Sequence, residues 1–393
     1  MGGGRAKLRR LVRLAGAAAM AAALAACAQF QTVQRPAPIA QAPTQQPTAP
    51  TRPNDGVLRV GLLLPLSGSN ASLGEAMQRA AQMAVFDTGT QVVLLPRDTG
   101  DNASAASQSA QAVIAQGADI ILGPLFSKAV SPVAQQARAA GINVVSFSTD
   151  TAQAGGNVFL LSVLQQQAID RIVGYGVNHG MRRYAFLAPN TQYGQLMRKA
   201  MADAAAKYGA EVPVVELYDS KLSDPTPLQQ KLQATPVDAV LVADVGSRLG
   251  VVAPMLGYSG VTAKLMGTGQ WDDPSVNRQS YLAGAWYAAP DPSRRADFES
   301  RYAQQFGAPP PRLATLAYDA VALTAALANQ PASGGNPFTT AALQDPNGFV
   351  GLDGIFRFGP DGLVQRGLAV LEAQPGGPTV LEAAPDSFSG AAF

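Results

Sequence analysis

Continuous apolar runs alternate with amphipathic helical segments from residue 57 onward. The first run, residues 57–64, reads VLRVGLLL. A polar loop from Ser67 to Asn70 follows it, and then a helix that Ser72 and Glu75 would open as a capping box. Strands that are apolar on both faces and alternate with helices indicate parallel sheets covered on both sides.

The same alternation continues in two sets of elements. In the first set we predict strands at 91–95, 119–122 and 142–147, and helices at about 102–116 and 128–140. In the second set we predict strands at 184–188, 212–217, 238–243 and 264–267, and helices at about 165–178, 194–208, 227–234 and 247–257. Two α/β lobes follow from this pattern.

A short repeat suggests that the two sets are related. Residues 74–80 and 194–200 share G-x-x-M-x-[RK]-A, each after an apolar strand, a proline and a polar loop. Chance similarity between alanine-rich amphipathic helices explains the match about as well. After Tyr287 we expect helices at about 294–306 and 312–329. A hairpin-like segment follows, in which residues 355–358 and 368–371 flank the turn at 359–362, and it returns to the lobes. Repeated crossing between two lobes makes a hinge, and hinged lobes make a clamp.

The predicted fold is therefore α/β and two-lobed, each lobe a parallel sheet sandwiched by helices and joined to the other by hinge crossovers. Its boundaries are a signal peptide at 1–26, Cys27 with a tether at 27–56, an N-terminal lobe at 57–163 plus about 288–337, a C-terminal lobe at 164–287 plus about 338–375, and a tail at 376–393.

The N-terminus has the pattern of a lipoprotein signal. Five basic residues precede an apolar stretch, residues 14–26, which is shorter than the 20 or so residues of a membrane span and ends in Leu24-Ala25-Ala26-Cys27. Lipid on Cys27 would anchor the mature protein in a bacterial envelope. The alternative is a plain secretory signal with an accidental cysteine. Since Ala28 and not Asp follows Cys27, the chain resembles lipoproteins sorted to the outer membrane of two-membrane cells.

The composition indicates an extended tether and argues against nucleic acid as a partner. Residues 28–54 are rich in Pro, Gln, Thr and Ala, so they should stay extended and could reach up to roughly 80 Å. The formal charge of +2 includes the five basic residues of the signal; the mature chain has 24 basic against 27 acidic residues. A slightly acidic body without basic clusters argues against nucleic acid and against electrostatic membrane binding.

Catalytic patterns are weak. The D-T-G segments at Asp87 and Asp98 are similar to those of aspartic proteases, but they stand eleven residues apart and not in two pseudosymmetric lobes. His179 is the single histidine and stands at a predicted helix end, while Cys27 is the single cysteine. Histidine-based triads and the usual zinc sites therefore lack residues. We expect no enzyme, no metal and no cofactor; an envelope hydrolase is the weakest hypothesis.

Polar loops at the carboxyl ends of the strands are the candidate site. Ligands of open α/β sheets bind at this edge, near helix N-termini that attract carboxylates. Hydroxyls and amides there suit a small polar or zwitterionic ligand, with Phe126, Tyr193 and Trp271 as an apolar wall. Each Ser, Thr or Asp could instead serve only as a helix cap. The candidate ligand-binding residues are Ser67, Ser127, Ser146, Ser148, Asp150, Tyr193, Asp244, Gln270 and Asp272.

Four segments in and around these loops resemble those of one known protein family. R-V-G-L-L-L-P-L-S-G at 59–68, I-L-G-P at 121–124, V-V-S at 144–146 and Q-Y-G at 192–194 are similar to the leucine-binding, type I periplasmic binding family. The resemblance implies that Ser127, Ser146, Ser148 and Asp150 hold the carboxylate and amine of an amino acid, and that Tyr193 lies on an aromatic wall. It also implies delivery to an ABC permease for amino-acid transport.

One departure from the family leaves the ligand open. Where an acid receives the ligand's amine, this chain has Gly269-Gln270, and only Asp244 or Asp272 could substitute. A second branch of the fold, the lipoprotein activators of penicillin-binding proteins, has similar L-L-L-P-L-[ST]-G and G-P-L segments. Cys27 and the long tether suit that branch, which implies a penicillin-binding protein as partner in peptidoglycan synthesis.

Overall fold

The computed structural model describes residues 57–219, 226–244, 248–250, 252, 254, 256, 262–329 and 335–389, and these form two large sheets with separate hydrophobic cores and one small sheet. The predictions for Cys27, the signal and the tether lie outside these residues. Of the helix predicted at 247–257, residues 248–250, 252, 254 and 256 are described, and all of them are helical. No helix in the described ranges has the length and apolar character needed to cross a bilayer.

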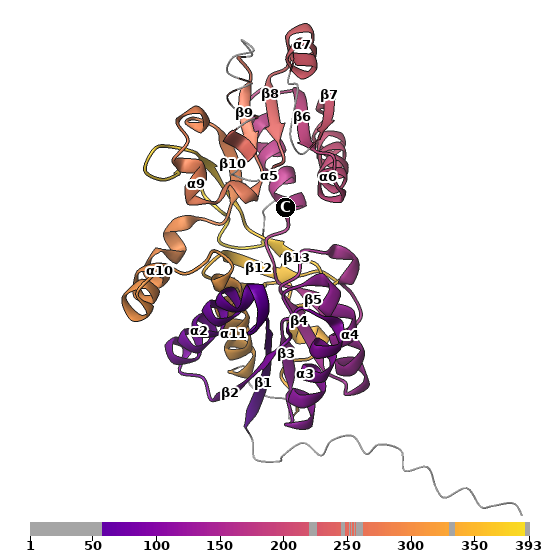
Figure 1. Cartoon of the computed structure of the whole chain (residues 1–393), viewed down its shortest axis with the longest axis vertical. Coiled ribbons are helices and arrows are strands. Elements are labelled where there is room, and N and C mark those ends of the chain that lie inside the picture. The colour runs from indigo at the N-terminus through magenta and orange to yellow at the C-terminus, as the bar shows by residue number, and fades with distance from the viewer. Residues whose placement is uncertain are drawn as a thin grey trace, which may run out of the picture. The chain divides into compact units, whose positions relative to one another are not determined.

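The first sheet is parallel throughout, in the order β2 (Val92–Asp98), β1 (Leu58–Leu64), β3 (Ile120–Leu122), β4 (Asn143–Ser146) and β5 (Val158–Leu160). Successive residues of β1 point into different cores: Leu62 and Leu64 pack with Met77, while Leu63 packs with Val113. Helices α2 (Ala71–Thr88) and α11 (Ala314–Ala328) therefore cover one face, and α3 (Ala103–Ala115) and α4 (Ser127–Ala139) cover the other (Figure 1).

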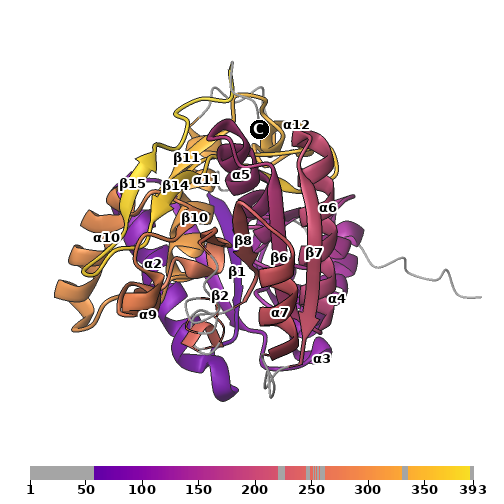
Figure 2. The ribbon, with the colours of Figure 1, turned by 90° about the horizontal axis from the view of Figure 1, so that it is seen from above.

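The second sheet has the order β15-β14-β10-β9-β8-β6-β7. Its parallel strands are β6 (Arg183–Pro189), β7 (Glu211–Tyr218), β8 (Ala239–Val242), β9 (Lys264–Gly267) and β10 (Trp286–Ala289); β14 (Ala369–Glu372) and β15 (Thr379–Glu382) are antiparallel to their neighbours. Helices α5 (Gln165–Asn178) and α6 (Gln192–Tyr208) pack on one face, and α7 (Thr226–Ala234) packs on the other. In the view from above, α6 and α7 lie beside β6 and β7 (Figure 2).

A small antiparallel sheet, β11 (Phe349–Gly351), β12 (Gly354–Phe358) and β13 (Val364–Arg366), differs from expectation. Residues 338–375 were expected in the second lobe, yet Phe356, Phe358 and Val364 pack in the first core. Only from Leu368 onward does the segment join a second-lobe core, and β15, in the expected tail, extends that sheet. The pairing is therefore β12 with β13, not the predicted 355–358 with 368–371.

Three crossovers join the lobes. Residues 161–164 connect β5 to α5, residues 290–291 connect β10 to α10 (Pro292–Phe306), and residues 367–368 connect β13 to β14. The predicted two-lobed α/β architecture with hinge crossovers is confirmed. The remaining short elements are η2 (Gly68–Asn70), η3 (Thr151–Gln153), η4 (Gly269–Trp271), α9 (Pro274–Asn277), η5 (Ser280–Leu282) and α12 (Thr340–Leu343).

Helix ends agree only in part with the sequence. The predicted capping box at Ser72 and Glu75 was wrong, because α2 begins at Ala71 with Asn70 as N-cap. Asn102 caps α3, accepting a hydrogen bond from the Ala105 amide at 2.9 Å. His179 is the C-cap of α5, with Nδ1 2.8 Å from the Tyr175 carbonyl oxygen and its ring 4.0 Å from the Tyr175 ring. This contact supports a structural role for the histidine.

The D-T-G aspartates occupy different surroundings. Asp87, near the end of α2, accepts two hydrogen bonds from Arg301 at 2.9 Å each and one from Tyr318 at 2.8 Å, so it ties α2 to α10 and α11. Asp98, at the end of β2, accepts from the Leu66 and Gly100 amides at 2.8 Å each. Asp87 therefore joins helices, and Asp98 holds a loop.

Asp87→Asn should make stability less dependent on pH. Hydrogen bonds from Arg301 lower the pKa of Asp87 below 3.8, so its contribution is complete above that value and is lost as the pH falls through the lowered pKa. With the Arg301 side chain 40% exposed, we expect a loss of only about 1 kcal/mol at pH 7. Urea unfolding between pH 3 and 8 should show this difference shrinking below about pH 4. Asp203→Asn, in an exposed pair with Lys199, is the control, and a constant difference at all pH values would contradict the assignment.

Candidate functional site

The carboxyl edges of the two sheets meet at the N-terminus of α5. Residues 161–164 lead directly from the end of β5 to Gln165, the first residue of α5. Gln165 also lies beside the loop after β9, since a Cβ built on Gly269 would be 3.2 Å from Gln165 Oε1 and 3.5 Å from the Ala168 Cβ. Because parallel strands end at one edge of a sheet, loops of both lobes converge on this junction.

On the first lobe, hydrogen bonds from loop amides and hydroxyls shape the edge. Ser67 is exposed and donates to Asp98. Burial alone would raise the pKa of Asp98, but the bonds from Ser67, Gly100 and Leu66 outweigh burial and lower that pKa. Asp98 thus stays ionised as a support for the loop that presents Ser67.

Ser127 is the most available hydroxyl of this edge. It is the first residue of α4, half-buried, and its side chain has no hydrogen bond to the residues that the structure describes. Helix N-termini present free amides, so Ser127 stands where a carboxylate would bind. Phe126, one residue earlier, packs against the first core.

The hydroxyls after β4 support the loop. Ser146 is fully buried and donates to the Pro124 carbonyl at 2.8 Å. It also accepts from the Ser148 amide at 3.2 Å, and the Ser148 hydroxyl accepts from the Asp150 amide at 3.1 Å. Asp150 caps η3 by accepting from the Ala152 amide at 3.2 Å. Ser146 is therefore a structural residue, while Ser148 keeps its hydroxyl proton for a further acceptor.

On the second lobe, a buried aspartate is fully engaged. Asp244, with a side chain 0% exposed, accepts from the Tyr218 hydroxyl at 2.6 Å and from Arg248 Nε at 2.8 Å. Arg248 Nη2 lies 2.6 Å from the same carboxylate. Burial and the hydrogen bond to Asp244 raise the pKa of Tyr218, and the bond to Asp244 raises the pKa of Arg248. The aspartate is thus neutralised by its own neighbours.

Tyr193 and Gln270 complete this edge. The Tyr193 hydroxyl is buried close to Thr268 but has no hydrogen bond of good geometry within the described residues. Burial raises the pKa of Tyr193 to about 12, so the phenol keeps its proton. Gln165 Oε1 and Gln270 Oε1 are also buried without a partner among the described atoms. Buried polar atoms usually have partners, so these atoms are a sign of a binding surface.

Asp272 and Trp271 point elsewhere. Both carboxylate oxygens of Asp272 are taken, by Arg295 and Arg312 at 2.7 Å each. Trp271 is 0% exposed and packs in the second core with Tyr287, at a ring separation of 6.5 Å. The predicted site residues therefore divide into the junction itself and, for Asp272, an ion network between the lobes.

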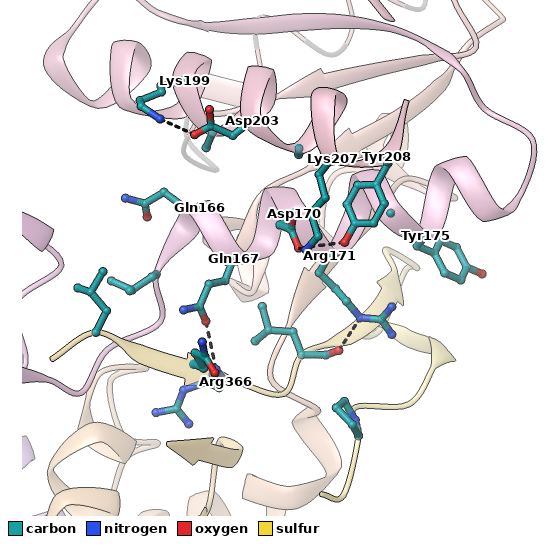
Figure 3. A pocket seen from close by; sticks show the side chains of 18 of the residues that line it. Gln166, Gln167, Asp170, Arg171, Tyr175, Lys199, Asp203, Lys207, Tyr208 and Arg366 are labelled. Carbon is teal, nitrogen blue, oxygen red and sulfur yellow. Dashed lines mark hydrogen bonds and ion pairs between the residues drawn. The ribbon is translucent and has the colours of Figure 1, made fainter. Parts of the chain in front are cut away.

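The cavity of about 880 Å³ in Figure 3 borders the junction at Thr151 and Leu164 but extends along α5 and α6. Helices α5 and α6 form its walls with the segments around β13 and β15, and Lys199 pairs with Asp203 while Arg171 pairs with Glu382. Gln167 accepts from the Arg366 amide at 3.2 Å and donates to the Val364 carbonyl, so it closes the edge of β13. None of the nine predicted ligand residues lines this cavity.

Sequence reasoning missed Arg248, Tyr218 and Gln165. One signal was present: Arg248 stands four residues after Asp244 in a segment predicted to be helical, the spacing of an ion pair. Tyr218 and Gln165 carry no comparable signal, because they reach the site only through the sheet order and the crossover.

Similarity to curated proteins is partial. The chain is 22% identical over 162 residues to the uncharacterized protein RP748 of Rickettsia prowazekii, covering 41% of this chain and 43% of that protein. It is 28% identical over 144 residues to the penicillin-binding protein activator LpoA of Glaesserella parasuis, covering 36% of this chain and 24% of that protein. The chain thus matches less than half the length of either relative.

Similarity in structure covers most of the chain. The ABC transporter substrate-binding protein of Desulfitobacterium hafniense, solved in complex with Leu, superposes with a TM-score of 0.64 at 22% identity, over 83% of this chain and 100% of that one. This confirms the type I periplasmic binding fold. The model of the periplasmic binding protein family matches residues 57–378, a family of binding proteins and not of enzymes. The chain therefore belongs to the periplasmic binding protein family, as the resemblance of its loops indicated.

Proposed function

We propose that this chain is an extracytoplasmic solute-binding protein that closes its two lobes on a small, carboxylate-bearing, amino-acid-like ligand and delivers it to an ABC-type permease. A lipid on Cys27 would anchor it to the envelope, facing the periplasm, and the 28–54 segment would be its tether. The family match and the likeness in fold to an ABC substrate-binding protein support the transport role.

The observation that carries the proposal is the convergence of both carboxyl edges on the N-terminus of α5. Ser127 and Ser148 offer hydroxyl donors from the first lobe, and Tyr193 offers a neutral phenol from the second. A ligand that touches both edges favours the closed form by its differential affinity, and a permease can read that form. The crossovers at 161–164, 290–291 and 367–368 are the hinge.

A thermal-shift screen of amino acids and small organic acids tests this function. A ligand at a hundred times its Kd should stabilise the protein by about 2.7 kcal/mol. Ser127→Ala and Tyr193→Phe, which removes only the hydroxyl, should each weaken that ligand's Kd at least about tenfold without lowering the unliganded stability by more than about 1 kcal/mol. Ser300→Ala, on the exposed side of α10, is the control. If both site variants bind as tightly as the unmodified protein, the ligand site is not at this junction.

The match to LpoA favours a second function, activation of a penicillin-binding protein in peptidoglycan synthesis. In that case the lobes would act through contact with the synthase, and no small molecule would be needed for closure. Absence of any thermal shift, together with direct binding to a purified peptidoglycan synthase, would favour this function over transport.

A further inference from the structure

An arginine faces the ligand junction from the second lobe, and the acids near it are already used. Asp244 is shared between Tyr218 and Arg248, and Asp272 lies between Arg295 and Arg312. A bound ammonium group needs an ionised acceptor with free lone pairs. Both aspartates are buried, with side chains 0% and 9% exposed, and their charge is already balanced by arginines, so an ammonium would have to lose its hydration beside a guanidinium to reach either one.

Arg248 is held so that one side of its guanidinium stays free. Nε and Nη2 contact Asp244, while Nη1 has no hydrogen bond to the described residues and the side chain is 39% exposed. The guanidinium donates in a fixed planar geometry and never accepts. Tyr193 follows β6 and Arg248 follows β8, and because these two strands are parallel neighbours, both residues lie at the same edge of the sheet.

Tyr193 presents a second donor beside it. The phenol stays protonated at physiological pH, and its hydroxyl is buried without a well-formed partner in the described structure. The second-lobe edge thus offers an O–H and an N–H where an amino-acid binder needs an acceptor. An ammonium placed there would meet a guanidinium and lose its hydration without compensation.

We propose that the ligand group facing the second lobe is a hydrogen-bond acceptor and not an ammonium, which makes the ligand a carboxylic acid with a second carbonyl, with 2-oxo acids as the simplest members. Arg248 is then the specificity-determining residue, supported by Asp244 and assisted by Tyr193. This inference rests on the proposed function, since it names the ligand class of the same junction.

Isothermal titration with matched pairs tests the ligand class. The pairs are alanine and pyruvate, leucine and 4-methyl-2-oxopentanoate, and phenylalanine and phenylpyruvate; each pair differs only in ammonium against carbonyl. We expect the oxo acid of the best-bound pair to bind at least tenfold more tightly than its amino acid. Arg248→Gln should weaken the oxo acid at least tenfold and leave the amino acid within about threefold.

Because Arg248→Gln leaves Asp244 buried without its cation, the double variant Asp244→Asn/Arg248→Gln repeats the measurement without that charge. Arg198→Gln, an arginine on exposed α6 surface, is the matched control and should change neither affinity. An amino acid bound as tightly as its oxo acid, with a ratio unchanged by loss of Arg248, would overturn this inference and leave the proposed function standing. If no member of any pair binds, the transport function itself fails and the inference with it.

Discussion

Replacing Arg312 with methionine should destabilise the protein by about 3–5 kcal/mol, because it leaves two acids without their shared cation. Arg312 Nε lies 2.7 Å from Asp272 and Nη2 lies 2.8 Å from Asp353, whose side chain is 0% exposed. Asp272 comes from the loop after β9 in the second lobe, and Asp353 from the turn between β11 and β12 beside the first core. Burial would lower the pKa of Arg312, but both carboxylates outweigh it and raise that pKa.

Urea unfolding followed by circular dichroism measures this loss. Arg79→Met is the control, since Arg79 and Glu75 form a pair 3.8 Å apart with side chains 45% and 56% exposed and should contribute under about 0.5 kcal/mol. Arg312→Met/Asp353→Asn should recover part of the stability, because it removes one uncompensated charge. A loss no larger than that of the control would show that the network contributes nothing across the lobes.

The periodicity of the sequence predicted the repeated units closely, for local reasons. The strand at 264–267 and the helix at 165–178 have the predicted bounds, and β6 differs from 184–188 by one residue at each end. These segments have apolar patterns that their own length and flanking polar loops delimit. By contrast β5, only three residues long, gives no periodic signal.

The sequence did not allow us to predict which distant segments pair with each other. The apolar alternation of Ile355 to Phe358 correctly indicated a strand, but its partner is β13 and its core is that of the first lobe. The local pattern favours the wrong partner, since β13 is the three-residue segment Val-Gln-Arg while β14 begins with three apolar residues. The lobe that a returning segment joins is decided by which sheet face remains uncovered, a property of the assembled fold.

The candidate site shows the same division. We predicted Ser127, Ser148, Tyr193 and Asp244 as site residues from the ends of the predicted strands, because the edge of a parallel sheet follows from the strand pattern. What each side chain does there depends on its neighbours. Asp272 and Asp244 both had the chemistry of an amine acceptor, but Arg295, Arg312 and Tyr218 reach them from more than 20 residues away. Such contacts turn a possible amine acceptor into part of a structural ion pair, and the spacing of residues along the sequence does not reveal them.

The shared G-x-x-M-x-[RK]-A segments have a common structural reason. Gly74 and Gly194 each lie in the first turn or so of a helix, against the carbonyl of the proline that follows or ends the preceding strand. A Cβ built on Gly74 would be 2.0 Å from the Pro65 oxygen, and one on Gly194 would be 1.9 Å from the Pro189 oxygen. Met77 and Met197, three residues on, are both buried in their lobe's core. The two lobes thus use one strand-to-helix device, which supports a repeat over chance similarity.

Gly194→Ala should therefore destabilise the protein by about 3 kcal/mol or more, and Gly74→Ala by a similar amount. Helix propensity alone predicts the opposite sign, a gain of about 0.5–1 kcal/mol, so the sign of the change separates the two effects. The obstructing atom is a backbone oxygen, so relief would require α6 to move away from the end of β6 and Met197 to leave its core. Gln195→Ala, one residue on and exposed, is the control and should stay within about 0.5 kcal/mol. Equal or higher stability of Gly194→Ala in urea unfolding would show that the helix does not approach the strand this closely.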